Sequence, residues 1–264
     1  MRDTVAPMIA PGEVGFLNGG VVTASKKCAI IASLREANSV AGEELRLLRS
    51  RVRSVCQAGN LRCLALTSAL PGEGKTTLAL GLAAAFARDP GRRVLLIEAD
   101  VRRPTASKNL GLPPAPGLGE WLNGRLDQVP IRRVEPGGFS LLVAGQTPVE
   151  RPESLGSAQM ARLLRTARNA FDDVLLDVPP LVPVADTTLM QDLLDGILLV
   201  VRSRLTPREA IVNALGRLHP EKVIGVILND HQEYRLSYSA YSYKRYGMAE
   251  GQMSSSGPKG RHKP

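Results

Sequence analysis

Aromatic side chains make up only 4% of this 264-residue sequence. Half of them are tyrosines, and these fall within thirteen positions near the end of the chain: Tyr234, Tyr238, Tyr241, Tyr243 and Tyr246. Tyrosines that pack in a core are spread along strands and helices, where the ring is buried and the hydroxyl finds a partner. These five instead lie in a polar, basic segment. We therefore predict that they are exposed and serve a purpose other than packing.

Long apolar runs and cysteine pairs are also missing. The best N-terminal candidate for a membrane span, 21–34, is interrupted by Lys26 and Lys27 and is shorter than the roughly 18–20 apolar residues required. No compact apolar segment follows an N-terminal charge cluster, which excludes a typical secretory signal. The sequence has three cysteines, and no two of them form a C-x-x-C motif. We expect a reduced, cytoplasmic setting and no structural metal.

The net charge of +9 is not concentrated in the body of the chain. Residues 1–60 carry 8 basic and 5 acidic groups (+3), residues 61–230 carry 20 and 18 (+2), and residues 231–264 carry 6 and 2 (+4). A DNA-binding domain more often has a basic stripe on its folded face. We therefore expect no nucleic-acid partner, the alternative being a partition-type ATPase that binds DNA weakly through its basic ends.

Hydrophobic patterning divides the chain into three parts. Residues 1–38 lack periodicity and are predicted to be a flexible arm, residues 39–230 to be a domain that opens with a helix at about 40–58, and residues 231–264 to be a disordered tail. The predicted strands are 61–68, 94–98, 139–143, 174–177, 197–201 and 223–228, and the later helices are 76–88, 157–171 and 207–218. Continuous apolar strands that alternate with helices predict an α/β fold, a doubly wound and mostly parallel sheet flanked by helices.

A phosphate-binding loop follows the first predicted strand of the domain. From Ala69 the sequence reads Ala-Leu-Pro-Gly-Glu-Gly-Lys-Thr-Thr and opens a helix, as such a loop requires. Glycines let backbone amides curl around a phosphate chain, and the helix N-terminus adds its positive dipole end. The alternative is a glycine-rich turn that merely links strand and helix. The predicted ATP-binding residues here are Pro71, Gly72, Glu73, Gly74, Lys75, Thr76 and Thr77.

Acidic residues mark the ends of two later strands. Glu98 and Asp100 follow the strand at 94–98, and Asp177 closes the strand at 174–177. Because ligands bind beyond the carboxyl ends of parallel strands, we expect these acids to face the nucleotide. There they can hold a metal or orient an attacking hydroxyl. Each acid alone could instead be a helix N-cap, but their order together with the loop favours a nucleotide site.

Together these motifs resemble the bacterial tyrosine kinases (BY-kinases) of capsule and exopolysaccharide synthesis. The resemblance runs from about residue 42 to 246 and includes the loop, Asp100-Val-Arg-Arg-Pro, Leu176-Asp177-Val-Pro-Pro, the stretch 145–155 and the tyrosine cluster. It implies a P-loop NTPase fold of the deviant-Walker (SIMIBI-like) type. The deviant-Walker ATPases that partition plasmids are the competing interpretation, but they carry an extra lysine where this chain has Leu70.

The resemblance also implies an activity, cofactors and roles for single residues. The activity is ATP-dependent autophosphorylation of the tyrosine cluster, with ATP and Mg²⁺ as cofactors. The implied catalytic residues are Lys75, Glu98, Asp100 and Asp177, the implied metal ligands are Thr76, Asp100 and Asp177, and the implied further ATP contacts are Arg103 and Asn229. Asn229 is equally well explained as a buried turn residue.

Glu98 departs from the usual Asp-x-Asp pattern, and its extra methylene moves the carboxylate by about 1 Å, which matters where geometry is tight. A nucleotide-switched co-regulator with weak or no kinase activity therefore stays open.

Glu43, Arg46 and Arg49 are similar to an oligomerisation motif of the same family. A spacing of three keeps them on one side of the first helix, where they could bridge subunits. The resemblance thus implies a ring-like homo-oligomer, and the alternative is an ordinary solvated helix face.

The position of the tyrosines suggests transfer between subunits. Tyr234 can reach at most roughly 17 Å from Asn229, whereas Tyr246 can reach roughly 58 Å. Each phosphate adds about −1.5 to −2 charges, so full modification would reverse the +4 charge of the tail. The family further implies a membrane adaptor (a polysaccharide co-polymerase) that activates the kinase, a cognate tyrosine phosphatase, and a cytoplasmic location at the inner face of the cell membrane.

Overall fold

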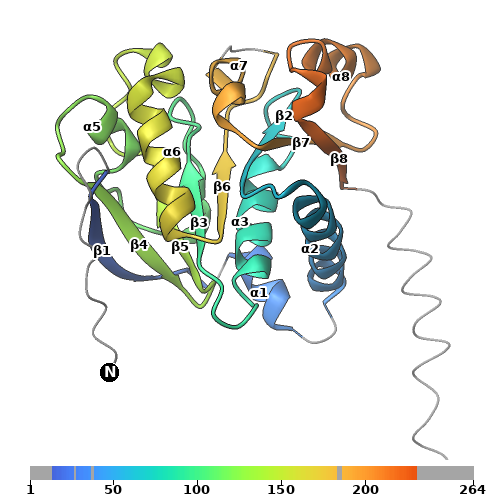
Figure 1. Ribbon diagram of the computed structural model, residues 1–264. Helices are drawn as coiled ribbons and strands as arrows, with labels where there is room; N and C mark the ends of the chain where they lie inside the picture. The colour runs from blue at the N-terminus through green and yellow to red at the C-terminus, as the bar shows by residue number, and fades with distance from the viewer. Residues whose placement is uncertain (1–13, 27, 37–38, 183–185, 231–264) are drawn as a thin grey trace, which may run out of the picture. The chain divides into compact units, whose positions relative to one another are not determined.

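The computed structural model describes residues 14–26, 28–36, 39–182 and 186–230. At its centre lies an eight-stranded sheet in the order β1-β4-β5-β3-β6-β2-β7-β8 (Figure 1). Neighbouring strands are parallel, except that β4 and β5 are antiparallel. The strands are β1 (Phe16–Thr23), β2 (Cys63–Ser68), β3 (Val94–Glu98), β4 (Val129–Glu135), β5 (Phe139–Leu142), β6 (Asp173–Asp177), β7 (Gly196–Arg202) and β8 (Val223–Asn229).

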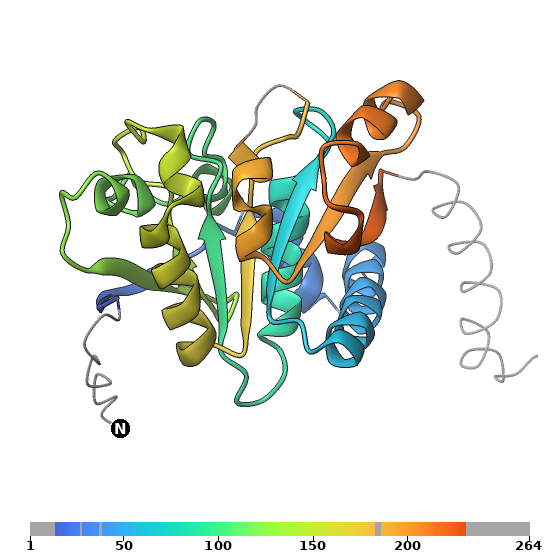
Figure 2. The same cartoon turned by 45° about the horizontal axis from the view of Figure 1, so that its top comes forward.

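Helices cover both faces of the sheet (Figures 1 and 2). The α-helices are α1 (Ala29–Arg35), α2 (Val40–Gly59), α3 (Lys75–Phe86), α4 (Ala106–Leu110), α5 (Leu118–Leu122), α6 (Ala158–Ala170), α7 (Asp186–Met190) and α8 (Arg208–Leu215). Three short 3₁₀ helices are η1 (Pro152–Gly156), η2 (Gln191–Leu193) and η3 (Pro220–Lys222). Within the described ranges, no helix is long and apolar enough to cross a membrane.

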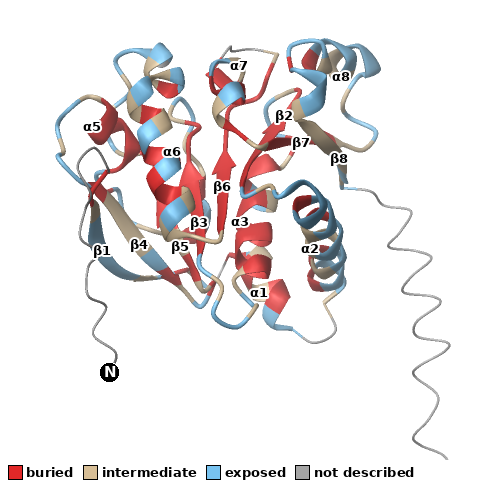
Figure 3. Ribbon diagram, viewed as in Figure 1, coloured by how far each residue is buried: buried red, intermediate tan, exposed pale blue. Residues whose placement is uncertain are grey.

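The alternation of side chains along each strand creates two hydrophobic cores. Leu64 and Leu66 of β2 pack with residues of α1 to α4, whereas Cys63 and Ala65 pack with residues of α5 to α8. Successive side chains of a strand point to opposite faces, so a strand covered on both sides must be apolar throughout. Every residue of β2, β3 and β6 is buried, as Figure 3 shows for the middle of the sheet.

The predicted fold class is confirmed. Each of the six predicted strands is present, with ends that differ by at most two residues from the prediction. The helices predicted at 40–58, 76–88, 157–171 and 207–218 correspond to α2, α3, α6 and α8.

The prediction of a flexible arm over residues 1–38 is wrong for the part that is described. Phe16–Thr23 forms β1, which pairs in parallel with β4 at the edge of the sheet, and Ala29–Arg35 forms α1. Most residues of β1 are exposed, which explains why the strand has no apolar pattern. Four further elements were not predicted from the sequence: β4 and the five-residue helices α4, α5 and α7. Such helices are shorter than two turns and show little periodicity.

Candidate active site

The predicted phosphate loop lies between β2 and α3, at the carboxyl end of the parallel strands. Gly72 and Gly74 have φ angles of +83° and +89°, a conformation that glycine adopts without steric cost. A Cβ at Gly74 would also collide with the side-chain amide of Asn229. No side chain caps the start of α3, so the first N–H groups of this helix can bind an anion. The loop has the curvature and the donors that a phosphate chain needs.

Lys75 is the charged centre of the site. Its Nζ lies 2.8 Å from Asp100 Oδ2, 3.1 Å from Asp177 Oδ1 and 3.5 Å from Thr76 Oγ1. Burial opposes the charge of this lysine, but the two carboxylates outweigh that effect and hold its pKa above the usual range. The start of α3, the segment after β3 and the end of β6 thus bring four of the predicted residues together. We refer to Lys75, Thr76, Asp100 and Asp177 as the Lys75 cluster.

Asp177 is fully buried, and one of its oxygens lacks a partner. Burial raises the pKa of this carboxyl to about 6, and Lys75 limits the rise. Oδ1 faces Lys75, whereas Oδ2 has no hydrogen-bond partner among the described residues. An unpaired buried acceptor costs about 1–3 kcal/mol, so this oxygen calls for a donor or a cation. Hard carboxylate and hydroxyl oxygens suit Mg²⁺ with part of its water shell, and the Lys75 cluster supplies them.

Two side-chain pairs connect the segments around the cluster. Thr105 donates from Oγ1 to Thr76 Oγ1 at 3.0 Å. Arg102 donates from Nε and Nη2 to both carboxylate oxygens of Asp186, at 2.7 and 3.1 Å. This second pair links the segment after β3 to the start of α7. Sequence reasoning missed Thr105 and Asp186, although Thr105 directly follows the Arg-Arg-Pro motif.

Comparison with known proteins assigns the chain to a family. The sequence profile described as CobQ/CobB/MinD/ParA nucleotide binding domain matches residues 64–243. The tyrosine-protein kinase YwqD of Bacillus subtilis (strain 168) is 32% identical over 213 residues, which are 77% of this chain and 89% of YwqD. The chain belongs to the bacterial tyrosine-protein kinase family.

Other relatives extend the family to longer proteins and to a solved structure. The succinoglycan biosynthesis transport protein ExoP of Rhizobium meliloti (strain 1021) is 40% identical over 174 residues, which are 64% of this chain but 22% of ExoP. The kinase domain of the Escherichia coli tyrosine kinase ETK superposes with a TM-score of 0.68 and 32% identity, over 76% of this chain and 79% of that one. The chain therefore matches most of a short kinase and only about a fifth of ExoP. The predicted P-loop fold and family are confirmed.

In this family member, Glu98 binds its own surroundings rather than Lys75. Its fully buried carboxylate accepts hydrogen bonds from Ala106 N at 2.6 Å, Ala144 N at 3.1 Å and Ser107 Oγ at 3.2 Å. We predicted that Glu98 faces the nucleotide, and this placement must be corrected. The longer glutamate side chain reaches the start of α4 and the residues after β5, where three donors occupy both of its oxygens.

The opposite side of the loop is held by residues after β7 and at the end of β8. Glu73 is buried, accepts a hydrogen bond from Leu70 N at 2.9 Å and contacts the hydroxyl of Thr206. Asn229 donates from Nδ2 to the carbonyl oxygen of Glu73 at 2.9 Å. Asn229 thus contacts the phosphate loop directly, while its contact with adenine stays a prediction. Thr206 carried no motif that would have identified it from the sequence.

The remaining predicted ATP-binding residues lie in the loop, in the first turn of α3 and in the segment after β3. Pro71, Gly72, Thr77 and Arg103 are exposed. The backbone N–H of Arg103 donates to Asp100 Oδ1 at 3.1 Å and fixes the turn after β3. Their role in binding ATP stays a prediction.

The predicted oligomerisation residues already have partners within the subunit. Arg46 pairs with Glu43 on α2. Arg49 donates from Nη1 to Asp89 Oδ1 at 2.8 Å and to the carbonyl oxygen of Ala85 at 3.3 Å. Their part in a subunit interface stays a prediction. The five predicted phosphoacceptor tyrosines lie outside the described residues.

Proposed function

We propose that this chain is an ATP-dependent protein-tyrosine kinase that phosphorylates its own C-terminal tyrosines and so regulates the synthesis and export of an exopolysaccharide or capsule. The Lys75 cluster carries the proposal, because it gathers a cation, two buried carboxylates and a hydroxyl beside a phosphate loop. Family membership supports it, as does the similarity to ExoP, a succinoglycan biosynthesis transport protein.

The loop and the cluster would bind ATP in the following way. Backbone amides of the loop and of the start of α3 hold the phosphates. Lys75 exchanges its carboxylate partners for the β- and γ-phosphates. Thr76, Asp100 and Asp177 would then hold Mg²⁺, which neutralises negative charge on the transferred phosphoryl group.

Asp100 is the residue that we propose orients the incoming tyrosine. Its Oδ1 is held by the Arg103 N–H, and its Oδ2 becomes available once Lys75 turns to the phosphates. The phenol oxygen forms a bond to the γ-phosphorus, the bond from that phosphorus to ADP breaks, and Asp100 accepts the phenol proton. Positioning and charge neutralisation are the main requirements of such a transfer.

Glu98 would act indirectly, as a positioning residue. Its hydrogen bond from Ala106 joins the two ends of the segment that carries Asp100 and Thr105, and its bond from Ala144 ties that segment to the residues after β5. A nucleotide-switched co-regulator without transfer is the second candidate function, because Glu98 takes the place of the first aspartate in the family's Asp-x-Asp pattern and, with three hydrogen bonds already accepted, leaves Asp100 without a second carboxylate to orient the tyrosine.

Transfer between subunits of a homo-oligomer is the arrangement that we favour. Tyr246 follows Asn229 by seventeen residues and can reach roughly 58 Å from it. As the family resemblance implies, we further propose that a membrane adaptor activates the chain at the inner face of the cell membrane and that a tyrosine phosphatase resets it.

Intact-mass measurement of the purified full chain with ATP and Mg²⁺ tests this function. We expect mass gains in steps of one phosphate, which vanish in Lys75→Met and when the five tyrosines are replaced by phenylalanine. Nucleotide binding without any mass gain would support the co-regulator. Phosphate release without mass gain would indicate a positioning-type ATPase and contradict the proposal.

A further inference from the structure

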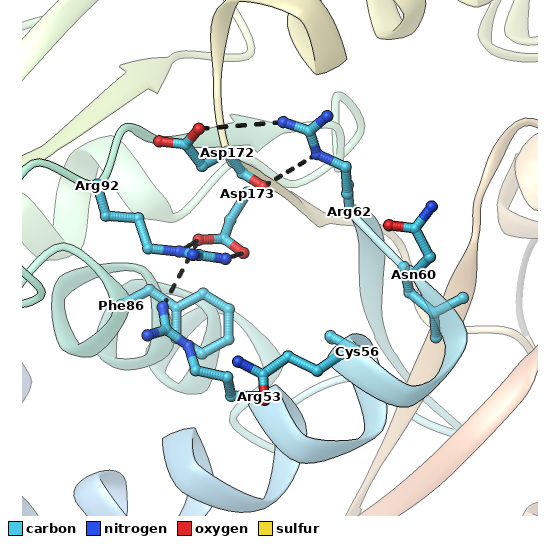
Figure 4. Close-up of a pocket in the computed structure, with 10 residues that line it drawn as sticks. Arg53, Cys56, Asn60, Arg62, Phe86, Arg92, Asp172 and Asp173 are labelled. Carbon is cyan, nitrogen blue, oxygen red and sulfur yellow. Dashed lines mark hydrogen bonds and ion pairs between the residues drawn. The ribbon is translucent and has the colours of Figure 1, made fainter.

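A second charged hollow lies at the amino end of the strands, away from the phosphate loop. Its volume is about 210 Å³, far above the ~10–15 Å³ that a single water needs. It is lined by the last turns of α2, the residues between α2 and β2, the end of α3, Arg92 before β3, and Asp172 and Asp173 at the start of β6 (Figure 4). Because parallel strands share one direction, these segments meet at the edge opposite the Lys75 cluster.

The charges that line this hollow are unequal. Three arginines, Arg53, Arg62 and Arg92, face two aspartates, Asp172 and Asp173. The lining therefore has one more positive than negative charge. Arg49 and Asp89, which form an ion pair at 2.8 Å nearby, add one charge of each sign and do not alter this excess. The hollow is therefore suited to an anion.

Two of the three arginines have sufficient partners within the chain. Arg92 binds both carboxylate oxygens of Asp173, at 2.5 and 2.9 Å. Arg62 donates to the carbonyl oxygen of Phe171 at 3.1 Å, and so satisfies a backbone acceptor at the C-terminus of α6. A structural role at strand and helix ends accounts for these two side chains.

Arg53 is not accounted for in this way. It forms an ion pair with Asp89 through Nη1 and packs over the ring of Phe86, 5.2 Å from the ring centroid. Its Nε and Nη2, however, are buried and have no hydrogen-bond partner among the described residues, and Nη2 lies 4.0 Å from Oδ2 of Asp173, too far for a hydrogen bond. Burial, followed by the nearby charge of Arg92, lowers the pKa of this guanidinium.

The unpaired atoms of Arg53 resemble the unpaired oxygen of Asp177 in the first site. Among the described residues, Arg53 and Asp177 are the two whose side chains have buried polar atoms without a partner. In Asp177 the orphan is an acceptor, and it lies where a cation is expected. In Arg53 the orphans are donors beside a hollow, so they require an acceptor.

We propose that this hollow binds a phosphate group, either inorganic phosphate or a phosphate monoester. A phosphate offers several acceptor oxygens and nearly two negative charges, and guanidinium groups bind it through paired N–H donors. The Arg53 side chain is 20% exposed, and binding would require its guanidinium to rotate so that Nε and Nη2, which are now buried, face the hollow. The exposed amides of Gln57 and Asn60 supply neutral donors at the rim.

Calorimetric titration of the full chain with inorganic phosphate and with phenyl phosphate tests the proposal. ADP and Mg²⁺ are kept in excess, so that the phosphate loop is filled. We expect saturable binding that Arg53→Met weakens at least tenfold. Gln57→Glu, which adds a negative charge at the exposed rim without changing the side-chain shape, should also weaken binding. Arg51→Met is the matched control, because Arg51 is an exposed arginine of the same helix outside the hollow.

The outcomes separate the sources of phosphate and can overturn the site. Tighter binding of phenyl phosphate than of inorganic phosphate indicates a phosphotyrosine ligand, and equal binding indicates a free oxyanion. If Arg53→Met is unstable, Gln57→Glu decides. Absence of saturable binding to the wild-type chain, or equal loss in Arg51→Met, refutes the proposal.

Discussion

At the carboxyl end of the sheet one lysine serves two carboxylates, whereas at the amino end three arginines face two aspartates. Each end contains a buried polar group with an unmet requirement: an acceptor on Asp177 and donors on Arg53. The first end also has a glycine loop with positive φ angles and a helix N-terminus, which are the parts of a phosphate site that backbone supplies. The second end relies on side chains alone. This difference explains why the first site can be recognised from a motif and the second cannot.

The largest expected effect comes from removing the cation of the carboxyl end. Lys75→Met leaves Asp100 and Asp177 buried without their partner and removes the contact to the phosphates. We expect transfer to fall by roughly 100-fold or more, in line with the loss of one preorganised charge-stabilising donor. Quantified phosphotyrosine over time measures it. Retention of transfer within a few fold would contradict the role of the Lys75 cluster.

A pH titration sharpens the role of Asp177. Its pKa of about 6 is above the ordinary value of 3.8, so folding disfavours the ionised form, and its contribution to stability declines as pH rises from about 4 to about 6. A metal ligand must be ionised. We therefore expect the affinity for Mg²⁺-nucleotide to fall about tenfold per pH unit below pH 6, since one proton then competes with binding.

The control for this titration is Asp177→Asn. This variant should bind Mg²⁺-nucleotide weakly and with little dependence on pH between 5 and 7. If the variant keeps the pH dependence of the wild-type chain, another group is responsible for it.

Changes at Glu98 distinguish positioning from proton transfer. Glu98→Asp is too short to reach Ala106 N and Ala144 N together, and Glu98→Gln places an amide donor against N–H groups. We expect both to lower the free energy of unfolding by about 1–3 kcal/mol, the cost of leaving buried donors unpaired, and to weaken nucleotide binding several-fold. Denaturant unfolding and nucleotide titration measure these effects, with the exposed Glu44→Gln as control.

A general base would give the opposite pattern. Glu98→Asp would then retain or raise the rate of transfer, whereas Glu98→Gln would abolish it without changing nucleotide affinity. The limb of the pH–rate profile due to that base would disappear in the glutamine variant.

The smallest effect is expected from Arg53→Met at the other end. Methionine can still pack on Phe86, Asp89 keeps its bond to Arg49, and the cost of burying an incompletely paired charge is removed. We expect a change in stability within about 1 kcal/mol and no change in nucleotide affinity. Thermal unfolding and nucleotide titration measure both. A large loss of nucleotide affinity would show that the two ends are coupled.

The sequence allowed most of the fold and half of the site to be predicted, for physical reasons. Strands buried on both faces leave continuous apolar runs, and the loop from Ala69 has a fixed spacing of glycines and lysine. Hydrogen-bond partners, by contrast, could not be predicted in this way. Glu98, for example, accepts a hydrogen bond from Ala144, which lies 46 positions away in the sequence. That contact depends on how β3 and β5 are placed in the sheet, which no local pattern encodes. The edge strand β1 was missed because its exposed residues need no apolar pattern.

A mixing experiment tests most directly whether the Lys75 cluster phosphorylates the tyrosines of another copy. One chain carries Lys75→Met with its tyrosines intact, and the other has an intact site with the five tyrosines replaced by phenylalanine. One of the two chains is uniformly labelled with ¹⁵N, so that their masses stay well apart and each can be read separately by intact-mass measurement after incubation with ATP and Mg²⁺. We predict phosphate on the Lys75→Met chain only in the mixture and on neither chain alone. If the mixture gains no phosphate while the wild-type chain does, transfer between subunits is wrong, and if the wild-type chain gains none either, the kinase proposal itself is contradicted.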